Sequence, residues 1–250
     1  MRIYRVEHQD TGVFAREEGG ALLLLSAAPW HAGEPTGERI ALATAKLLAP
    51  VEPSKIVCVG RNYRAHAQEL GNQVPSEPLL FLKPNSALLP SGGAIELPSA
   101  SQRVEHEAEI GVVIGKRLKQ SSPQQAAHAV FGITPVNDVT ARDIQKREVQ
   151  FTRAKGFDTF CPVGPAIVTD VDLQRLEVIG RVNGEQRQCG QATQMVFDIA
   201  TLLSFISHIM TLEPGDLVST GTPEGVGPLL AGDSVEVEIP GVGVLENVVR

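Results

Sequence analysis

The sequence predicts an α+β fold that is mainly β, with a small β-rich N-terminal module over residues 1–53 and a larger domain over residues 54–250. Segments that are rich in Val and Ile, or that alternate apolar and polar residues, outnumber segments with helical spacing. Strands and helices do not alternate regularly, which disfavours a doubly wound parallel sheet. At Pro53 a connector containing Pro and Gly gives way to a buried-strand pattern, which marks the boundary between the two parts.

The elements can be assigned in chain order from these patterns. Three short strands separated by Gly and acidic turns are expected in the module, at residues 3–6, 12–15 and 21–25. Residues 55–59 then form a buried strand that leads through Gly60 into a helical segment at residues 63–70. Further strands are predicted at residues 95–97, 104–114, 164–168, 176–182, 217–219, 234–239 and 243–249. Further helices are predicted at residues 123–130, 140–148 and 198–210.

Composition limits the function classes. A chain of 250 residues with 42% hydrophobic content can bury a full core. The net charge of −7 and the lack of any run of Lys or Arg argue against nucleic acid as a partner. The most apolar stretch, residues 21–30, is too short to span a bilayer, and the first residues are charged. We therefore expect a cytoplasmic protein with no membrane partner.

The strongest candidate for chemistry is the acidic strand at residues 104–114. Side chains two apart in a strand share a face, so Glu107 and Glu109 lie about 7 Å apart along the strand and can bind one hard cation. The alternative is an edge strand with a solvated acidic face. Asp138 would supply a third carboxylate, although an Asp before a helical segment is often only a helix cap.

A second candidate is the cluster from Gly60 to Glu69, which includes Arg61 and Asn62. On a helix, His66 and Glu69 face the same way, so the carboxylate can orient the imidazole and raise its basicity. This arrangement is typical of a general base. The alternative is an incidental pair on a surface helix, which the spacing alone does not exclude.

Further polar candidates follow Asp138 and the strand at residues 217–219. They are Arg142, Gln145, Lys155 and the tripeptide Thr220-Gly221-Thr222. Gly221 would let backbone N–H groups approach a ligand, and the hydroxyl groups could hold a carboxylate. A turn that needs glycine for its geometry is the commoner meaning of such a tripeptide. Residues 221–227 lack the Lys of a P-loop and do not fit a dinucleotide fingerprint, which argues against nucleotide binding.

Seven motifs in order resemble the fumarylacetoacetate hydrolase superfamily. They cover nearly everything from residue 54 onwards, and the first 53 residues are similar to the short leader module of single-core members. The motifs are G-R-N-Y-x-x-H-x-x-E (60–69), F-L-K-P (81–84), H-E-x-E-x-G-V-V-I-G (106–115), N-D-x-T-A-R-D-x-Q (137–145), A-K-G-F-D (154–158), V-N-G-E-x-x-Q (182–188) and T-G-T-P-x-G-V-G (220–227).

The resemblance implies a mixed β-roll core, a homodimer, and a role for each candidate residue. Mg²⁺ or Mn²⁺ would be bound by Glu107, Glu109 and Asp138. His66 and Glu69 would form a base dyad on a lid helix, and Lys155 would be a third catalytic residue. The residues expected to bind a small 2-oxo acid substrate are Arg61, Asn62, Arg142, Gln145 and Thr222.

The implied chemistry is the formation of an enolate from a 2-oxo acid, with the cation acting as a Lewis acid. The favoured reactions are hydrolysis of an acylpyruvate, in which the His66/Glu69 dyad would activate water, and decarboxylation of oxaloacetate. An isomerase or tautomerase, such as 2-hydroxyhepta-2,4-diene-1,7-dioate isomerase/decarboxylase, would use the same residues around the metal. A catalytically idle relative that serves as a binding module is the alternative from a different class.

Overall fold

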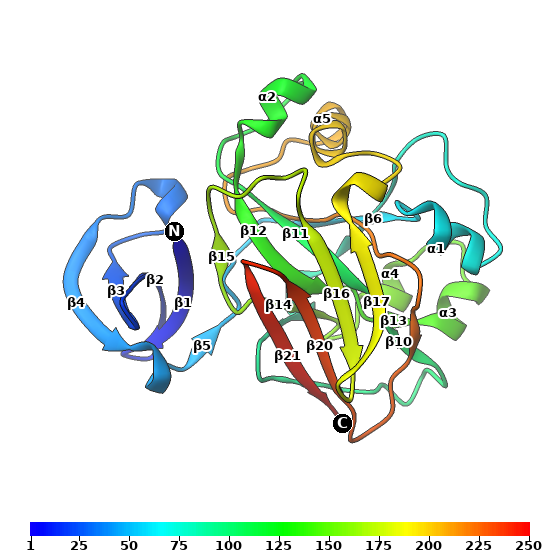
Figure 1. The fold of residues 1–250 in the computed structure, drawn as a ribbon, viewed down its shortest axis with the longest axis horizontal. Helices are drawn as coiled ribbons and strands as arrows, with labels where there is room; N and C mark the ends of the chain where they lie inside the picture. Colours follow the sequence, from blue (N-terminus) through cyan, green and yellow to red (C-terminus); the bar gives the residue numbers. More distant parts are fainter.

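The structure is a computed structural model that describes residues 1–250, and it confirms an α+β fold that is mainly β (Figure 1). The chain forms twenty-one strands, five α-helices and four short 3₁₀ helices. The strands lie in three sheets, of thirteen, three and five strands. No helix combines the length and the apolar character that crossing a bilayer requires.

The N-terminal module lies to one side of the molecule, in blue at the left of Figure 1. Its strands are β1 (Arg2–His8), β2 (Thr11–Glu18), β3 (Ala21–Leu25), β4 (Pro35–Ala41) and β5 (Leu47–Leu48). The first three match the predicted strands. β4 and β5 lie in the segment that was expected to be a connector. The sequence pattern did not indicate β4, because this strand is almost wholly exposed and carries no apolar face. β1 pairs with β15 (Ile167–Val168), so hydrogen bonds join the module to the rest of the sheet.

The strand that carries the candidate site is at the centre of the large sheet. β11 (Ala108–Ile114) pairs antiparallel with β12 (Val130–Asn137) on one side and with β18 (Leu217–Ser219) on the other. The other strands of this sheet are β6 (Ile56–Gly60), β7 (Leu79–Lys83), β8 (Leu88–Pro90) and β14 (Cys161–Val163). All seven residues of β11 are buried, as expected for a central strand.

Two smaller sheets complete the body. The three-stranded sheet contains β10 (Val104–His106), β13 (Thr140–Ala141) and β19 (Gly227–Pro228). The five-stranded sheet contains β9 (Ala94–Ile95), β16 (Glu177–Val182), β17 (Glu185–Gln191), β20 (Ser234–Ile239) and β21 (Gly243–Val249). The single strand predicted over residues 104–114 is therefore two strands in different sheets, interrupted at Glu107.

The helices are short except for one. They are α1 (Arg64–Glu69), α2 (Pro123–Ala127), α3 (Arg142–Arg147), α4 (Thr152–Lys155) and α5 (Ile199–Ile209), with 3₁₀ turns η1 (Pro29–His31), η2 (Leu42–Thr44), η3 (Asn85–Ala87) and η4 (Ala192–Gln194). α5 confirms its prediction, with Asp198 as N-cap accepting from the N–H of Thr201 at 2.8 Å. The predicted helix at residues 123–130 was too long, because the chain enters β12 at Val130. The helix predicted to begin at Thr140 begins two residues later, because β13 comes first.

The alternation of β11 divides its side chains between two clusters. Ile110, Val112 and Ile114 belong to the largest hydrophobic cluster, together with residues of α5 and the five-stranded sheet. Val113 belongs to the second cluster, so Glu109 lies on the face that is turned away from the main core.

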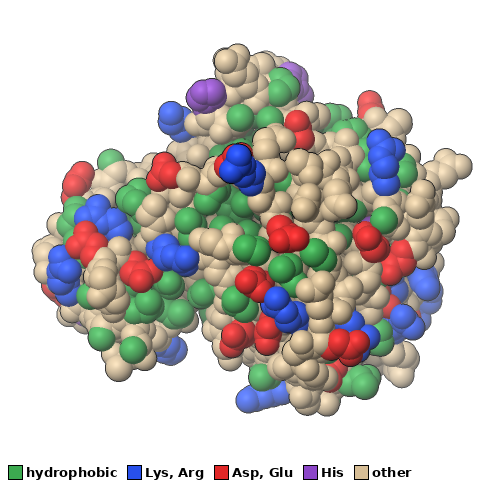
Figure 2. All heavy atoms as spheres, viewed as in Figure 1, with side chains coloured by type: hydrophobic (Ala, Val, Ile, Leu, Met, Phe, Trp, Pro, Cys, Tyr) green, Lys and Arg blue, Asp and Glu red, His purple; other side chains and the backbone are tan.

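On the face of the molecule that Figure 2 shows, charged side chains of both signs are interspersed.

Candidate active site

A cavity of about 310 Å³ lies beside the end of β11 and collects most of the predicted site residues. Those that line it are Arg61, His66, Glu107, Glu109, Arg142, Gln145, Lys155 and Thr222. We call its buried charged residues (Glu107, Glu109, Arg142 and Lys155) the floor, and its partly or fully exposed residues Arg61, Leu70, Asn72 and Lys146 the rim. The cavity is at the lower end of the roughly 300–1,000 Å³ typical of ligand pockets, so it suits a small molecule.

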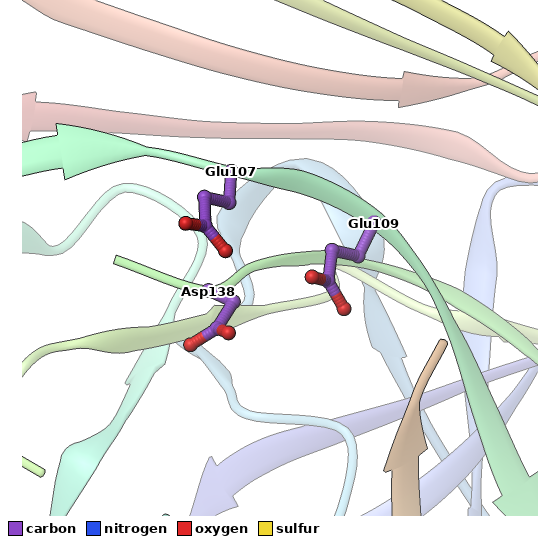
Figure 3. A group of neighbouring side chains, drawn as sticks. All are labelled: Glu107, Glu109 and Asp138. Atoms are coloured by element: carbon purple, nitrogen blue, oxygen red, sulfur yellow. The ribbon is translucent and has the colours of Figure 1, made fainter. Parts of the chain in front are cut away.

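Three carboxylates meet here: Glu107 and Glu109 of the floor, and Asp138, which does not itself line the cavity. Glu107, Glu109 and Asp138 each offer an oxygen within 4.8 Å of the others, and each is at most 4% exposed. In Figure 3 the two glutamates extend from the same side of one chain segment, with Asp138 next to them. The edge-strand alternative does not hold, because β11 is paired on both sides. The helix-cap alternative fails as well, since the N-cap of α3 is Ala141.

Backbone hydrogen bonds fix the position of this triad. Glu107 lies between β10 and β11, where its N–H donates to Oδ1 of Asn137 at 3.0 Å. The N–H of Asp138 in turn donates to the carbonyl oxygen of Glu107 at 2.9 Å. The register of β11 and β12, with Ala108 opposite Asn137, therefore determines that Asp138 meets the two glutamates.

Two buried lysines neutralise part of the triad. Nζ of Lys155 lies 2.8 Å from Oε2 of Glu107 and 2.5 Å from Oδ2 of Asp138. Nζ of Lys83 lies 2.5 Å from Oδ1 of Asp138 and also donates to the carbonyl oxygen of Val139 at 3.1 Å. Buried charges require such partners, because an unpaired one is strongly destabilising.

Arg142 connects the triad to β10. Its guanidinium pairs with Glu107, donates to Oε2 of Glu105 at 2.6 Å, and donates to Oε1 of Gln145 at 2.5 Å. Burial alone would lower the pKa of Arg142, but the charges of Glu107 and Glu105 outweigh it and raise this pKa. Arg142 is therefore held in place and charged on the floor of the cavity.

The two glutamates of the triad differ in their electrostatics. Burial, followed by the negative charges of Asp138 and Glu107, raises the pKa of Glu109 to about 8. Burial also acts to raise the pKa of Glu107, but the charges of Lys155 and Arg142 outweigh it and lower that pKa well below its usual range. Glu109 is the only member of the triad without an ion pair, so no side-chain cation offsets its charge when it is ionised.

The donor set around Glu109 fits a hard divalent cation. Its Oε2 accepts from the hydroxyl of Ser219 at 2.5 Å and from the N–H of Gly221 at 2.9 Å, whereas its Oε1 accepts no hydrogen bond. The three acidic side chains present only oxygen atoms, which are the ligands that Mg²⁺ and Mn²⁺ prefer. A cation would also lower the cost of keeping Glu109 ionised while buried.

The predicted base dyad faces the same cavity. Nδ1 of His66 lies 3.3 Å from Oε2 of Glu69 on α1, and the His66 side chain is 4% exposed and lines the cavity. Oε1 of Glu69 accepts from the N–H of Gly225 at 3.0 Å, which joins α1 to the loop after β18. His66 therefore lies at the cavity, and Glu69 connects it to the loop after β18 from the exposed side of α1.

The Thr-Gly-Thr segment closes one wall of the cavity. Gly221 has a φ of +98°, and a Cβ there would lie 2.7 Å from Cβ of Asn62, so glycine permits the close approach of the two loops. The hydroxyl of Thr222 donates to the carbonyl oxygen of Ala108 at 2.8 Å and accepts from Nε2 of Gln188 at 2.7 Å. The geometry is therefore compatible with both interpretations of this tripeptide, as a segment that contacts a ligand and as a turn that needs glycine.

One predicted substrate-binding residue does not line the cavity. The amide of Asn62 is fully buried and donates to the carbonyl oxygens of Phe197 and Thr220 at 3.0 and 2.8 Å. Its Oδ1 accepts from the N–H of Phe197 at 2.9 Å. The side chain therefore holds two loops together, and Arg61 beside it is the residue that reaches the cavity.

The structure adds three polar residues that sequence reasoning did not assign a role. Lys83 lies in the F-L-K-P motif and pairs with Asp138, and Glu105 pairs with Arg142. Gln188 ends the V-N-G-E-x-x-Q motif, and its Oε1 accepts from the N–H of Ala108 at 2.9 Å. The sequence offered one indication for Lys83 and Gln188, namely that each is a polar residue of a motif at a position within a strand. Their partners are too far away in sequence to be inferred from it.

A buried carboxylate triad, a lysine and a histidine around one small cavity form a candidate active site. The chain belongs to the fumarylacetoacetate hydrolase family, because residues 55–250 match the model described as fumarylacetoacetate (FAA) hydrolase C-terminal. Residues 1–50 match a second model, described as Rv2993c-like, N-terminal. The expected family is thereby confirmed, and the chain is an enzyme.

Relatives and solved structures agree with this assignment. An oxaloacetate decarboxylase of Dictyostelium discoideum is 46% identical over 75% of this chain and 89% of its own length. An oxaloacetate tautomerase of Bacillus subtilis is 42% identical over 82% of this chain and 73% of its own length. The structure of a 2-hydroxyhepta-2,4-diene-1,7-dioate isomerase from Mycobacterium marinum superposes with a TM-score of 0.91 at 43% identity, covering 100% of this chain and 98% of that chain.

Proposed function

We propose that this enzyme depends on a divalent metal ion and forms the enolate of a small 2-oxo acid, with decarboxylation of oxaloacetate as its principal reaction. The observation that carries this proposal is the triad of Glu107, Glu109 and Asp138, which lies within 4.8 Å next to Lys155 in a cavity suited to a small acid. The decarboxylase and tautomerase relatives support the choice of oxaloacetate.

The roles proposed for the residues follow from their chemistry. A cation bound by the triad would supply a Lewis acid beside the cavity. Arg142 binds the substrate carboxylate next to the keto group, with Gln145 and Thr222 as polar neighbours, and Lys155 donates a hydrogen bond to the keto oxygen as negative charge develops there. In decarboxylation the C3–C4 bond breaks, its electron pair forms the enolate, CO₂ leaves, and a proton added at C3 gives pyruvate.

Hydrolysis of an acylpyruvate is the second candidate, because His66 and Glu69 form a dyad that faces the cavity. Glu69 orients Nδ1 of the imidazole, which leaves Nε2 to take a proton from water. The resulting hydroxide attacks the distal carbonyl carbon, and cleavage of the C–C bond releases a carboxylic acid and pyruvate enolate. Enol–keto conversion of oxaloacetate uses the same enolate and needs only proton transfer at C3.

An assay of metal-stripped enzyme tests the proposal. Oxaloacetate decarboxylation, oxaloacetate enol–keto conversion and acetylpyruvate cleavage are compared with and without added Mg²⁺ or Mn²⁺. We expect metal to restore turnover, with decarboxylation the fastest of the three. Metal-independent turnover would contradict the role of the triad, and no turnover despite metal-induced thermal stabilisation would contradict the substrate class.

We also propose, from the sequence, a cytoplasmic homodimer in which residues 1–53 and 54–250 are separate domains. Light scattering coupled to size-exclusion chromatography checks the dimer, for which we expect twice the 26.7 kDa mass of the chain. Limited proteolysis checks the boundary, with cleavage expected at the exposed residues Glu52 and Ser54, on either side of the buried Pro53.

A further inference from the structure

Four cationic side chains line the cavity, and they fall into two pairs. Arg142 and Lys155 on the floor are engaged by the acidic residues around them. Arg61 and Lys146 on the rim also line the cavity, and the structure contains no ion pair or side-chain hydrogen bond of either. The only carboxylates in the lining are Glu107 and Glu109. In a chain with a net charge of −7, this cavity thus has two cations in excess of its anions.

Arg61 is positioned by a rigid loop. It has a φ of +57°, a left-handed conformation that a non-glycine residue adopts only when its surroundings enforce it. The enforcement comes from Asn62, whose buried amide is anchored to Phe197 and Thr220, and from Gly221, which packs against it. Arg61 is therefore a half-buried cation held at the cavity without a partner.

Lys146 is related to the floor by helix geometry. Arg142 and Lys146 are four residues apart on α3, so their side chains leave the same face of the helix with Cβ atoms about 5–6 Å apart. Arg142 engages the floor, and Lys146 lies one turn further out at the rim. A ligand with one carboxylate on the floor and another one helical turn away would contact both.

One part of the cavity wall is apolar. Phe81 and Phe151 line the cavity and pack edge to face, with ring centroids 5.6 Å apart. Nζ of Lys155 lies 5.0 Å from the centroid of the Phe81 ring. This wall can pack against a short carbon chain but offers no hydrogen bond to a polar group in the middle of it.

We infer that Arg61 and Lys146 form a receptor for a second carboxylate, so that this enzyme selects short 2-oxo dicarboxylates over 2-oxo acids with a neutral distal group. The inference rests on the proposed function for the orientation of the substrate, with its keto acid end on the floor. Arg61 and Lys146 are then specificity-determining residues, and neither takes part in enolate formation.

The test compares oxaloacetate with its 4-methyl ester, which has the same skeleton, can also enolise at C3, and lacks the distal charge. Enol–keto conversion of both is measured with the metal-loaded enzyme and with the variants Arg61→Gln, Lys146→Gln and the double variant. Arg147→Gln is the matched control, because Arg147 is exposed, lies next to Lys146 on α3 and does not line the cavity.

We expect the wild type and Arg147→Gln to prefer oxaloacetate. Lys146→Gln and Arg61→Gln should each lower kcat/KM for oxaloacetate about tenfold more than kcat/KM for the ester, mainly through KM, and the double variant should lose the preference. An equal loss for both compounds, or an unchanged preference in the double variant, would overturn the inference.

If neither compound is turned over, the proposed function has failed, but the carboxylate receptor can still be tested by ligand binding. The readout is then the increase in Tm that each compound gives with the metal-loaded protein. A larger increase with oxaloacetate than with the ester, present in the wild type and lost in the double variant, supports the receptor. Equal increases in the wild type overturn it.

Discussion

The floor and the rim of the cavity are two regions of opposite character. On the floor every cation is paired with a carboxylate, and each residue is almost completely buried. At the rim Arg61 and Lys146 have no partner and are more exposed. The difference indicates two roles. The paired charges of the floor keep a fixed arrangement, and the unpaired cations of the rim are available to a ligand.

Removing the carboxylate of the triad that has no ion pair should have the largest effect. Glu109→Ala should lower metal-dependent turnover by more than about 100-fold. Loss of a residue that only orients a metal ligand typically costs up to about 100-fold, and Glu109 is proposed to bind the metal directly. The measurement is kcat/KM at saturating Mg²⁺ or Mn²⁺. The metal-free Tm of Glu109→Gln, which keeps the shape of the side chain, checks that the fold is intact. Full activity in either variant would disprove the ligand assignment.

The His66/Glu69 dyad should separate the two candidate reactions. His66→Ala should lower acylpyruvate hydrolysis by about 10²–10⁴-fold, because the imidazole is the general base proposed for the attacking water, and should lower decarboxylation much less. Parallel assays of acetylpyruvate and oxaloacetate measure this. An equal loss of both reactions would show that the dyad serves a step that they share.

The buried triad should be far more sensitive to the loss of a charged partner than the surface is. Lys83→Met leaves Asp138 with one of its two lysine partners, so the free energy of unfolding should fall by about 3–5 kcal/mol. The control is Arg153→Ala, which removes an exposed pair with Glu148 and should cost about 0–1 kcal/mol. Urea denaturation measures both. Similar losses in the two variants would remove the distinction between buried and exposed charge.

The pH dependence of stability should reflect Glu109. Its pKa in the folded protein is about 8, above the ordinary value of 4.5, so unfolding releases its proton at any pH between these two values. The metal-free protein should lose up to about 1.4 kcal/mol of stability per pH unit between pH 5 and 8 from this group, and Glu109→Gln should lack that contribution.

The same titration bears on metal binding. The cation binds the deprotonated carboxylate, so the increase in Tm caused by Mg²⁺ should grow as the pH rises from 5 to 8. Differential scanning calorimetry at several pH values, with and without Mg²⁺, measures this. A metal-induced increase that is independent of pH would show that Glu109 is not protonated in the metal-free site.

Much of the fold could be predicted from local patterns, and the errors lie where a strand lacks the usual strand pattern or depends on a distant partner. Strands with an apolar face, such as β1 and β20, and the capped helix α5 were predicted within a few residues. β4 was missed because it is an exposed edge strand, and β12 was missed because Gly132 and Pro135 are atypical of strands. The break at Glu107 was missed because it depends on hydrogen bonds to Asn137, which lies in another strand.

The same limit applies to the site. The spacing of Glu107 and Glu109 was readable because both lie in one local segment. The partners of Asp138 were not, because Lys83 is 55 residues away along the chain. Asn62 shows the limit in another way: it is predicted to bind substrate, and in the structure its side chain joins two loops.

The mainly β fold, the family and the identity of the groups that can do chemistry could be predicted from the amino-acid sequence, because periodicity and motifs are written along the chain. Which of these groups meet depends on how the strands pair. The pairing of β11 with β12 brings Asp138 to the two glutamates, and α3 carries Arg142 to the floor and Lys146 to the rim. Charge compensation, and therefore which cations remain free for a ligand, depends on distances between strands that no sequence spacing encodes.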